Sequence, residues 1–491
     1  MKKLLLLIIT FFLTAQTIKA QTVVLDANGV TVKWTGTTVP NPRFVQASPR
    51  GTLEWFAIVN NTTKSNITDY AKNIQSGRTY FTRPFTTTPI PFNNIVTTLV
   101  TDMQNMFTDA HSFNQPIGSW NVGNVTTMAG MFYNATSFNQ PIGSWNVSNV
   151  TDMYRMFAGD TSFNQPIGSW DVSNVTNMFT MFYFALAFNQ PIENWNVSNV
   201  TDMQNMFNAA TSFNQPISSW NVGNVVNMEF MFYQATSFNQ PIGSWNVGNV
   251  VNMEFMFYQA TSFNQSISSW DVSNVTNMIY MFGGATAFNQ PISCWNVSNV
   301  TNMSYMFASA TAFNQNIGSW NVSKVTDMRD MFLDIQLSTA NFDALLIGWS
   351  TIGPNETSLK PNVTFSGGNS KYCNGATARN SIISTYGWTI TSGVFNCINI
   401  GTAGPNCQSL DTDNFNISSL KLFPNPVLSI LNVKVDSILI NQPYSIVDSL
   451  GRVILKGNIN DVDNSINVEQ LSKGIYYLKV SDNSASKFVK E

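Results

Sequence analysis

The sequence predicts a repeat solenoid of the α/β class, made of 25-residue coils and followed by a small antiparallel β-sandwich. Nine tryptophans stand 25 residues apart without an insertion, from Trp120 to Trp320, and Met-Phe pairs keep the same step from Met106 to Met331. A fixed period in this range is typical of solenoids, in which each repeat forms one coil. After residue 420 the chain alternates apolar and polar residues, which is typical of strands with one buried face.

The first part of each coil is expected to be a short parallel strand. Ile142, Trp145 and Val147 are spaced i, i+3 and i+5, so that the last two share one face of an extended segment. Pro141 excludes a helix from the return loop just before this segment. The tryptophan column is therefore expected to pack in the core rather than to form an aromatic binding box.

The second part of each coil is expected to be a two-turn helix. Its apolar residues follow at i, i+3, i+6 and i+7, which places them on one helical face: Val150, Met153, Met156 and Phe157. Asn149, with Asp152 three residues later, is typical of a capping box at the start of a helix. The methionine column is likewise expected to be core packing rather than a redox site.

A stack of such coils needs a cap at each end, because uncovered coils would expose apolar surface and aggregate. We assign residues 21–100 to an N-terminal cap, 101–331 to the repeats and 332–400 to a C-terminal cap. A linker rich in Gly, Asn and Asp covers 401–419 and precedes the domain at 420–491, in which Asp448–Gly451 separates two alternating runs and predicts a hairpin.

The N-terminus predicts export. Residues 1–20 combine two lysines, an apolar run and the small residue Ala20, as in a secretory signal peptide. No later segment approaches 18 consecutive apolar residues, so we expect no membrane span in the mature chain. The charged fraction is 10% and the net charge is −3, which argues against nucleic acid or an anionic membrane as a partner.

The repeats and the segments that close them carry a family resemblance. The motif I-x-x-W-N-V-S-N-V-x-x-M-x-x-M-F-x-x-A-x-x-F-N-Q, with ALLIGW and KYCNGATAR after the last repeat, resembles the BspA-like leucine-rich-repeat surface proteins of bacteria. The resemblance runs from about Leu25 to Trp388. It implies an extracellular adhesion or protein-interaction role and does not identify a partner.

The C-terminal domain carries a second resemblance. FPNPV at 423–427, DSLGR, LSKGIYYL at 471–478 and the ending KFVKE resemble the type A sorting domain of the type IX secretion system. Ser429 departs from the family, which often has an acidic or amide residue there. The resemblance implies that residues 420–491 engage the secretion machinery and that the protein reaches the cell surface or the medium.

A partner-binding surface is predicted where the copies of the repeat differ most, just before and just after each Met-Phe pair. If this segment is helical, these positions share one outward face. Aromatic residues, which are enriched at recognition sites, gather there: Tyr133, Tyr154, Phe179, Tyr183, Phe230, Tyr233, Phe255, Tyr258, Tyr280 and Tyr305. Two alternatives stay open: glycan binding by the uniform Asn/Ser face of the predicted strand, and a passive surface-layer scaffold.

No catalytic or cofactor site is predicted. The chain has no nucleophile–base pair, phosphate loop or metal-ligand spacing, so we expect no enzyme activity, no metal and no cofactor. His111 stands alone without Cys, Asp or Glu in a ligand pattern and is expected to be a surface residue. The Asn139-Gln140 column is expected to bind turn backbone groups as a stacked ladder.

Four cysteines suit an oxidising destination. We favour a Cys373–Cys397 disulfide over the two other possible connectivities, because it would close a compact segment of the C-terminal cap and contribute about 3 kcal/mol. Cys294 replaces the Ser that precedes Trp in most coils, and we expect it to be an outward-facing free thiol.

Overall fold

The computed structural model describes most of the chain, and its contacts divide the chain into two compact units, with the boundary between residues 406 and 407. The predicted signal peptide and most of the predicted linker lie outside the described residues. The described ranges are 22–41, 43–72, 81–351, 353, 357–398, 400–405, 421–435, 440–448, 452–480 and 484–491.

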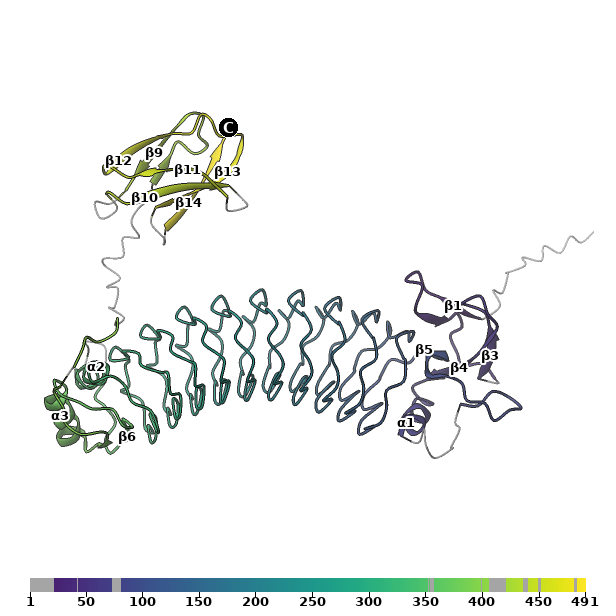
Figure 1. Cartoon of the computed structure of the whole chain (residues 1–491). Helices are drawn as coiled ribbons and strands as arrows, with labels where there is room; N and C mark the ends of the chain where they lie inside the picture. Colours follow the sequence, from purple (N-terminus) through teal and green to yellow (C-terminus); the bar gives the residue numbers. More distant parts are fainter. Residues whose placement is uncertain are drawn as a thin grey trace, which may run out of the picture. The chain divides into compact units, whose positions relative to one another are not determined.

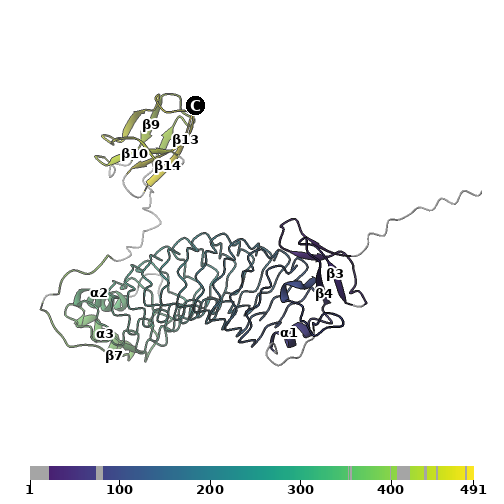
Figure 2. The same ribbon diagram turned by 45° about the vertical axis from the view of Figure 1, so that its right-hand side comes forward.

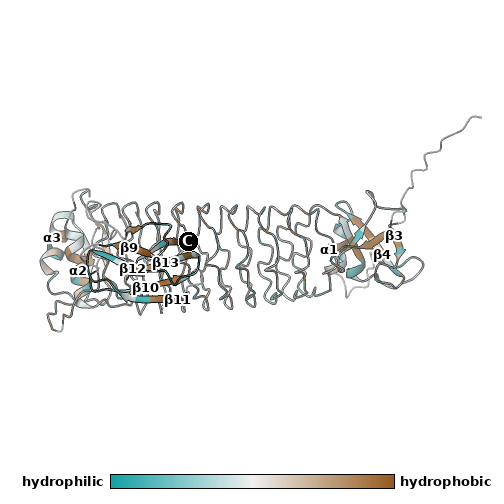
Figure 3. Ribbon diagram, turned by 90° about the horizontal axis from the view of Figure 1, so that it is seen from above, coloured by the Kyte–Doolittle hydropathy of each residue, from teal (hydrophilic) through white to brown (hydrophobic). Residues whose placement is uncertain are grey.

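The region before the repeats is built from small sheets. Strand β4 lies at the centre of a three-stranded sheet, antiparallel to β3 and parallel to β5, and its middle residues are buried. Figure 3 shows this strand largely in the apolar colour. The elements are β1 (Val23–Leu25), β2 (Val32–Trp34), β3 (Phe44–Ala47), β4 (Glu54–Asn60), α1 (Ser65–Lys72), the 3₁₀ helix η1 (Phe92–Asn94) and β5 (Ile95–Leu99).

The repeats stack one coil on the next in a row (Figures 1 and 2). The prediction of a strand and a helix in every coil is wrong: between β5 and residue 339 the chain has neither element, only turns and isolated parallel bridges. One bridge joins each coil to the next at the same position, from Asp102–Thr127 to Asn302–Asp327. The residues that were expected to form a helix instead form consecutive turns.

Left-handed residues explain why no helix forms. Two positions in each coil have positive φ, for example Arg155 (53°) and Gly159 (72°), which breaks the repeated right-handed geometry of a helix. Every second backbone N–H of this segment then donates to the next coil instead of to its own turn. In one coil, four N–H groups donate to carbonyl oxygens of the next coil at N–O distances of 2.7–3.1 Å: Met153 to Asn177, Arg155 to Phe179, Phe157 to Met181 and Gly159 to Tyr183.

Side chains replace a strand ladder on the other side of the coil. The Trp145 Nε1–H donates to the carbonyl of Ile117 in the preceding coil (3.1 Å), and the other tryptophans repeat this bond. The Asn149 amide donates to the carbonyl of Gly123 (2.6 Å). Asn149 is therefore not a helix cap, and Asp152 accepts from the Tyr154 N–H in a short turn of its own.

The predicted core columns are confirmed. The Trp, Met, Val, Ile and Phe columns are 0–3% exposed, and the phenylalanine rings stack from coil to coil. One hydrophobic core runs from Ala57 in β4 through the repeats to Ile390. The amide ladder is also confirmed: Asn139 Oδ1 accepts from the Asn164 N–H (3.0 Å) and from Gln165 Nε2 (2.8 Å), and each coil repeats the pattern.

The repeats end against two helices and a short parallel pair of strands. The elements are α2 (Thr339–Ser350), β6 (Thr364–Ser366), α3 (Ala376–Tyr386) and β7 (Thr389–Thr391). Ser338 begins α2 as its N-cap, and its own N–H donates to Asn314 Oδ1 (2.8 Å). The last amide of the ladder is thus bound by the cap.

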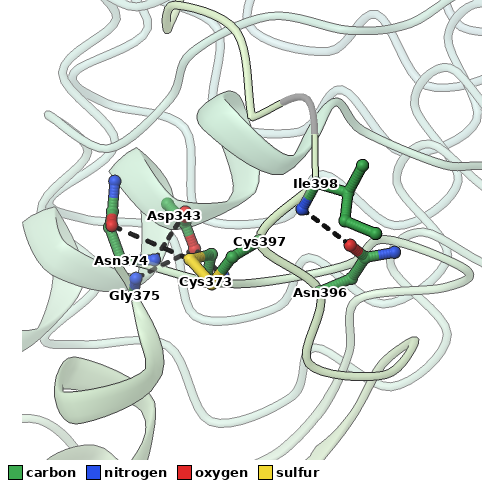
Figure 4. Close-up of a disulfide and its surroundings, with 7 residues drawn as sticks. All are labelled: Asp343, Cys373, Asn374, Gly375, Asn396, Cys397 and Ile398. Atoms are coloured by element: carbon green, nitrogen blue, oxygen red, sulfur yellow. Dashed lines mark hydrogen bonds between the residues drawn. A yellow bond between two sulfur atoms is a disulfide. The ribbon is translucent and has the colours of Figure 1, made fainter.

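A disulfide joins Cys373 and Cys397, the pairing favoured on sequence (Figure 4). Buried Asp343 of α2 holds the same loop, because its carboxylate accepts from the N–H groups of Cys373, Asn374 and Gly375 at 2.8–2.9 Å. Cys294 is exposed, as expected, but the prediction of a free thiol is wrong, because Cys294 is disulfide-bonded.

The C-terminal unit has the predicted antiparallel strands, in two sheets that share one core. The order is β11-β10-β13-β14 in one sheet and β12-β9-β8 in the other. Strands β10 and β11 pair as expected for a hairpin, although residues 449–451 of its turn lie outside the described residues. The strands are β8 (Lys421–Phe423), β9 (Ile430–Lys434), β10 (Pro443–Asp448), β11 (Val453–Asn458), β12 (Asp463–Asn467), β13 (Gly474–Val480) and β14 (Ser484–Lys490).

Candidate functional site

The predicted binding residues lie on the turn segment that carries the bridges between coils. We define three outer rows by the coil of Met153: the first row contains residue 154 and its equivalents, the second residue 155 and the third residue 158. All ten predicted aromatic residues occupy these rows, and all are half-buried. They lie on the outside of consecutive turns, so the prediction that they share one face of a helix is wrong.

Six of the ten form one continuous group, which we call the aromatic strip: Phe230, Tyr233, Phe255, Tyr258, Tyr280 and Tyr305. In the second row, Phe255 stacks on Phe230 at 4.7 Å between ring centroids and on Tyr280 at 4.9 Å. Tyr280 stacks on Tyr305 at 4.4 Å. The rings therefore face one another along the stack and turn their edges toward solvent.

The third row joins the strip from the side. Tyr233 stacks on Tyr258 at 4.9 Å, and Tyr258 meets Tyr280 at 5.4 Å with the two rings 83° apart. In the next coil this row has Gly283, where an added methyl group would lie 2.8 Å from Tyr280 and 3.0 Å from Tyr258. The two rings thus fill the space above the glycine, and the strip is a packed surface.

The other four predicted residues lie in earlier coils. Tyr154 stacks on Phe179 at 5.5 Å, and the Arg155 guanidinium lies 4.9 Å from the Tyr154 ring centroid and 5.7 Å from that of Tyr133. Tyr183 contacts Phe184 at 4.8 Å. Phe184 is 41% exposed and was missed, although it occupies another position at which the copies differ.

The backbone of the strip is unusual for aromatic residues. Phe230, Phe255, Tyr280 and Tyr305 all have φ between 52° and 57°, the left-handed region. A bulky side chain costs on the order of 1 kcal/mol there, whereas Gly and Asn adopt this conformation readily. Other coils have Gly130 or Asn205 at the same position. Backbone preference therefore does not account for four successive aromatic residues.

Two carboxylates border the strip in the first row. Glu229 Oε2 accepts from Gln204 Nε2 (3.0 Å) and Asn252 Nδ2 (3.2 Å), and Glu254 Oε2 accepts from Asn277 Nδ2 (2.7 Å). Burial raises the pKa of Glu229 above its usual range, and the charges of Glu254 and Asp202 raise it further. Burial also raises the pKa of Glu254.

The Asn/Ser face, the alternative glycan site, is occupied by internal hydrogen bonds. Asn221 Oδ1 accepts from the Gly223 N–H (3.1 Å), and Asn246 accepts from Gly248 in the same way (3.2 Å). Asp271 accepts from the Ser273 N–H (3.0 Å), and hydrogen bonds from Ser273 lower the pKa of the carboxyl. These oxygens stabilise turns within their own coils.

The rest of the described chain contains few residues that could form a catalytic or metal-binding site. His111 is exposed, with its Nδ1 2.9 Å from the Asn134 carbonyl oxygen. No group of three His, Cys, Asp or Glu side chains with metal-site geometry occurs among the described residues. A cavity of about 880 Å³ in the N-terminal region is open to solvent and lined by residues that include Phe44, Trp55 and Phe85.

Among the described residues, no helix has the length and apolar character needed to cross a membrane. Comparison with curated proteins finds no match.

Two family models match the chain. The model described as Mycoplasma protein of unknown function, DUF285, matches residues 78–190, 164–261 and 241–345, which together cover more than half of the chain. The model described as a secretion system C-terminal sorting domain matches residues 421–491, and a domain of this kind indicates export to the cell surface or the medium. The chain therefore belongs to the DUF285 family of repeat proteins and ends in a secretion sorting domain.

Proposed function

We propose that the protein is an extracellular interaction module that binds another protein through the aromatic strip. In this proposal the repeats form a solenoid related to the BspA-like leucine-rich-repeat proteins, and the sorting domain delivers them to the outside of the cell. The repeats act by presenting a rigid surface and not by catalysis.

The observation that carries the proposal is the aromatic strip. Six half-buried rings run across four successive coils and contact one another continuously. Four of these rings occupy left-handed backbone positions, where aromatic residues are unfavourable and where three other coils have Asn105, Gly130 and Asn205. Aromatic residues on a rigid support contribute most of the binding energy at many protein interfaces.

Stacking between coils is an alternative reason for the rings, since each stacked pair contributes about 0.5–1.5 kcal/mol. The core already contains continuous columns of stacked phenylalanine and tryptophan in every coil, however. Coils such as the one containing Asn205 and Asn208 stack without any aromatic residue in the second and third rows. The coils can therefore stack on one another without the aromatic strip, so stability does not explain why the strip is present.

Glycan binding is the second candidate function, and the regular Asn/Ser face favours it through its even step from coil to coil. Two observations weigh against it. The Oδ1 atoms of Asn221, Asn246 and Asp271 accept hydrogen bonds within their own coils. The second-row rings of the strip cover one another's faces by stacking, while sugar rings pack against aromatic faces.

A binding screen tests the proposal. The full secreted chain is applied to arrays of purified extracellular proteins and of glycans, and each hit is retested with two triple variants. One variant combines Tyr233→Ser, Phe255→Ser and Tyr258→Ser. The other combines Asn221→Ala, Asn246→Ala and Asp271→Ala and serves as the matched control, with thermal unfolding used to verify that both variants fold.

We expect a protein hit whose affinity falls by at least about tenfold, or 1.4 kcal/mol, in the aromatic variant and is retained in the control. Loss of binding in the Asn/Asp variant alone would favour the glycan face. No hit on either array would favour a passive scaffold.

A further inference from the structure

The repeats are strongly acidic although the whole chain is nearly neutral. Residues 101–331 contain three Arg and Lys residues and twelve Asp and Glu residues, a net charge of −9. The whole chain has 24 and 27, so the remaining residues number 21 and 15, a net charge of +6. Between Arg155 and Lys324 there is no Arg or Lys at all, while seven acidic residues occur.

Two of these acidic residues lie at the border of the aromatic strip. Glu229 immediately precedes Phe230, and Glu254 immediately precedes Phe255, so both carboxylates lie in the row next to the strip. Each is bound only through neutral amides of Gln or Asn among the described residues, and no Lys or Arg pairs with either. A partly buried carboxylate without a counter-ion is unfavourable.

We propose that the aromatic strip, together with Glu229 and Glu254, binds an Arg- or Lys-bearing segment of a partner protein. The inference rests on the proposed function and specifies its partner by chemistry. Long cationic side chains suit this surface because their aliphatic stems pack on apolar ring edges while their charged ends reach carboxylates. The Tyr233, Tyr258, Tyr280 and Tyr305 hydroxyl oxygens supply further acceptors.

The chain itself contains an example of this arrangement. Arg155 lies in the second row, and its guanidinium packs on Tyr154 and Tyr133 at 4.9 and 5.7 Å from their ring centroids. In the coils of the strip the second row has Phe or Tyr and no cation is present. A partner's Arg or Lys would bring to the strip a charge that it lacks, with the aliphatic stem on the ring edges and the charged end at Glu229 or Glu254.

The test uses the full secreted chain and a labelled peptide of four Gly-Arg-Leu repeats, with a matched peptide in which neutral citrulline replaces arginine. Affinity is measured by fluorescence anisotropy at about 0.15 M salt, where long-range attraction is screened beyond roughly 8 Å. The double variant Glu229→Gln/Glu254→Gln is compared with Asp171→Asn/Asp271→Asn. The latter removes the same two charges from the Asn/Ser face and is the matched control.

We expect the arginine peptide to bind at least about tenfold more tightly than the citrulline peptide, and the Glu variant to lose that advantage. The Asp variant should change affinity by less than about twofold. Equal weakening by both variants would show unspecific attraction to an acidic protein and would overturn the inference, as would equal binding of the two peptides.

Failure of this inference can be separated from failure of the proposed function. If a partner found by the array screen is lost in the Tyr/Phe variant but binds the Glu variant normally, the strip binds protein without recognising cations. If the Tyr/Phe variant has no effect on any partner, the proposed function itself fails.

Discussion

Asp160 is the residue at which one coil departs most sharply from the others. Eight of the nine equivalent positions from residue 110 to residue 310 contain Ala, whereas Asp160 places a fully buried carboxyl in the same core position. Its Oδ2 atom has no hydrogen-bond partner among the described residues. Burial raises the pKa of Asp160 to about 9, so the side chain is protonated at neutral pH.

We predict that Asp160→Ala stabilises the protein and reduces the dependence of its stability on pH. The unfolded chain releases the Asp160 proton near pH 3.9, while the folded chain keeps it until about pH 9. Between these values the unfolded state binds fewer protons, so the free energy of unfolding falls as pH rises, by at most about 1.4 kcal/mol per pH unit. Denaturant unfolding at pH 4.5 and pH 8 measures the effect.

The Asp160→Asn variant is the control, because it keeps the shape of the side chain and cannot titrate. Both variants should have a smaller difference between the two pH values than the natural chain, and the Ala variant should be the more stable at pH 8. An Ala variant with unchanged stability at pH 8 and an unchanged pH dependence would contradict this account.

At the scale of elements, the exact 25-residue step was enough to predict the stacking, the buried columns and the amide ladder. Those features depend on residue type and period alone, and every coil repeats them. The local conformation was mispredicted because the spacing of Met153, Met156 and Phe157 also fits consecutive turns that point every third or fourth side chain inward. Turns prevail because they free alternate N–H groups to bond to the next coil.

A signal for those turns was present in the sequence. The position of Arg155 has Asn105, Gly130 and Asn205 in other coils, and that of Gly159 has Asp109, Asn134 and Gly284 among others. Gly, Asn and Asp recurring at two fixed positions indicate left-handed backbone. The aromatic residues of the strip hide this signal in four coils. The aromatic composition of the candidate site was predictable, whereas the ring-on-ring packing was not.

We predict two disulfides with defined partners. A non-reduced digest should contain the Cys373 peptide linked to the Cys397 peptide, as the structure has it. The Cys294 peptide should be linked to the peptide containing Cys407, the one cysteine of the sequence that remains and that lies outside the described residues. Mass spectrometry of the linked peptides measures both. A Cys397–Cys407 linkage, or alkylation of Cys294 without reduction, would contradict the assignment.

At the scale of the whole molecule, we expect the sorting domain to direct export independently of what the repeats bind. Residues 421–491 match a secretion sorting domain and form a unit with its own hydrophobic core. Deleting these residues should leave the predicted signal peptide and the repeats intact but hold the protein in the periplasm. Fractionation of cells and medium measures this, with the full chain as the control. A truncated protein that reaches the medium in the normal amount would show that the tail is not required for export.

The central claim is that a protein partner binds the aromatic strip. Hydrogen–deuterium exchange of the full chain, alone and with the partner found by the array screen, locates the bound surface without any substitution. We predict that the partner slows exchange in peptides covering residues 229–234, 254–259, 279–284 and 304–309, and that the segments around Asn221, Asn246 and Asp271 exchange as before. Protection confined to the Asn/Ser segments or to the terminal regions would contradict the claim.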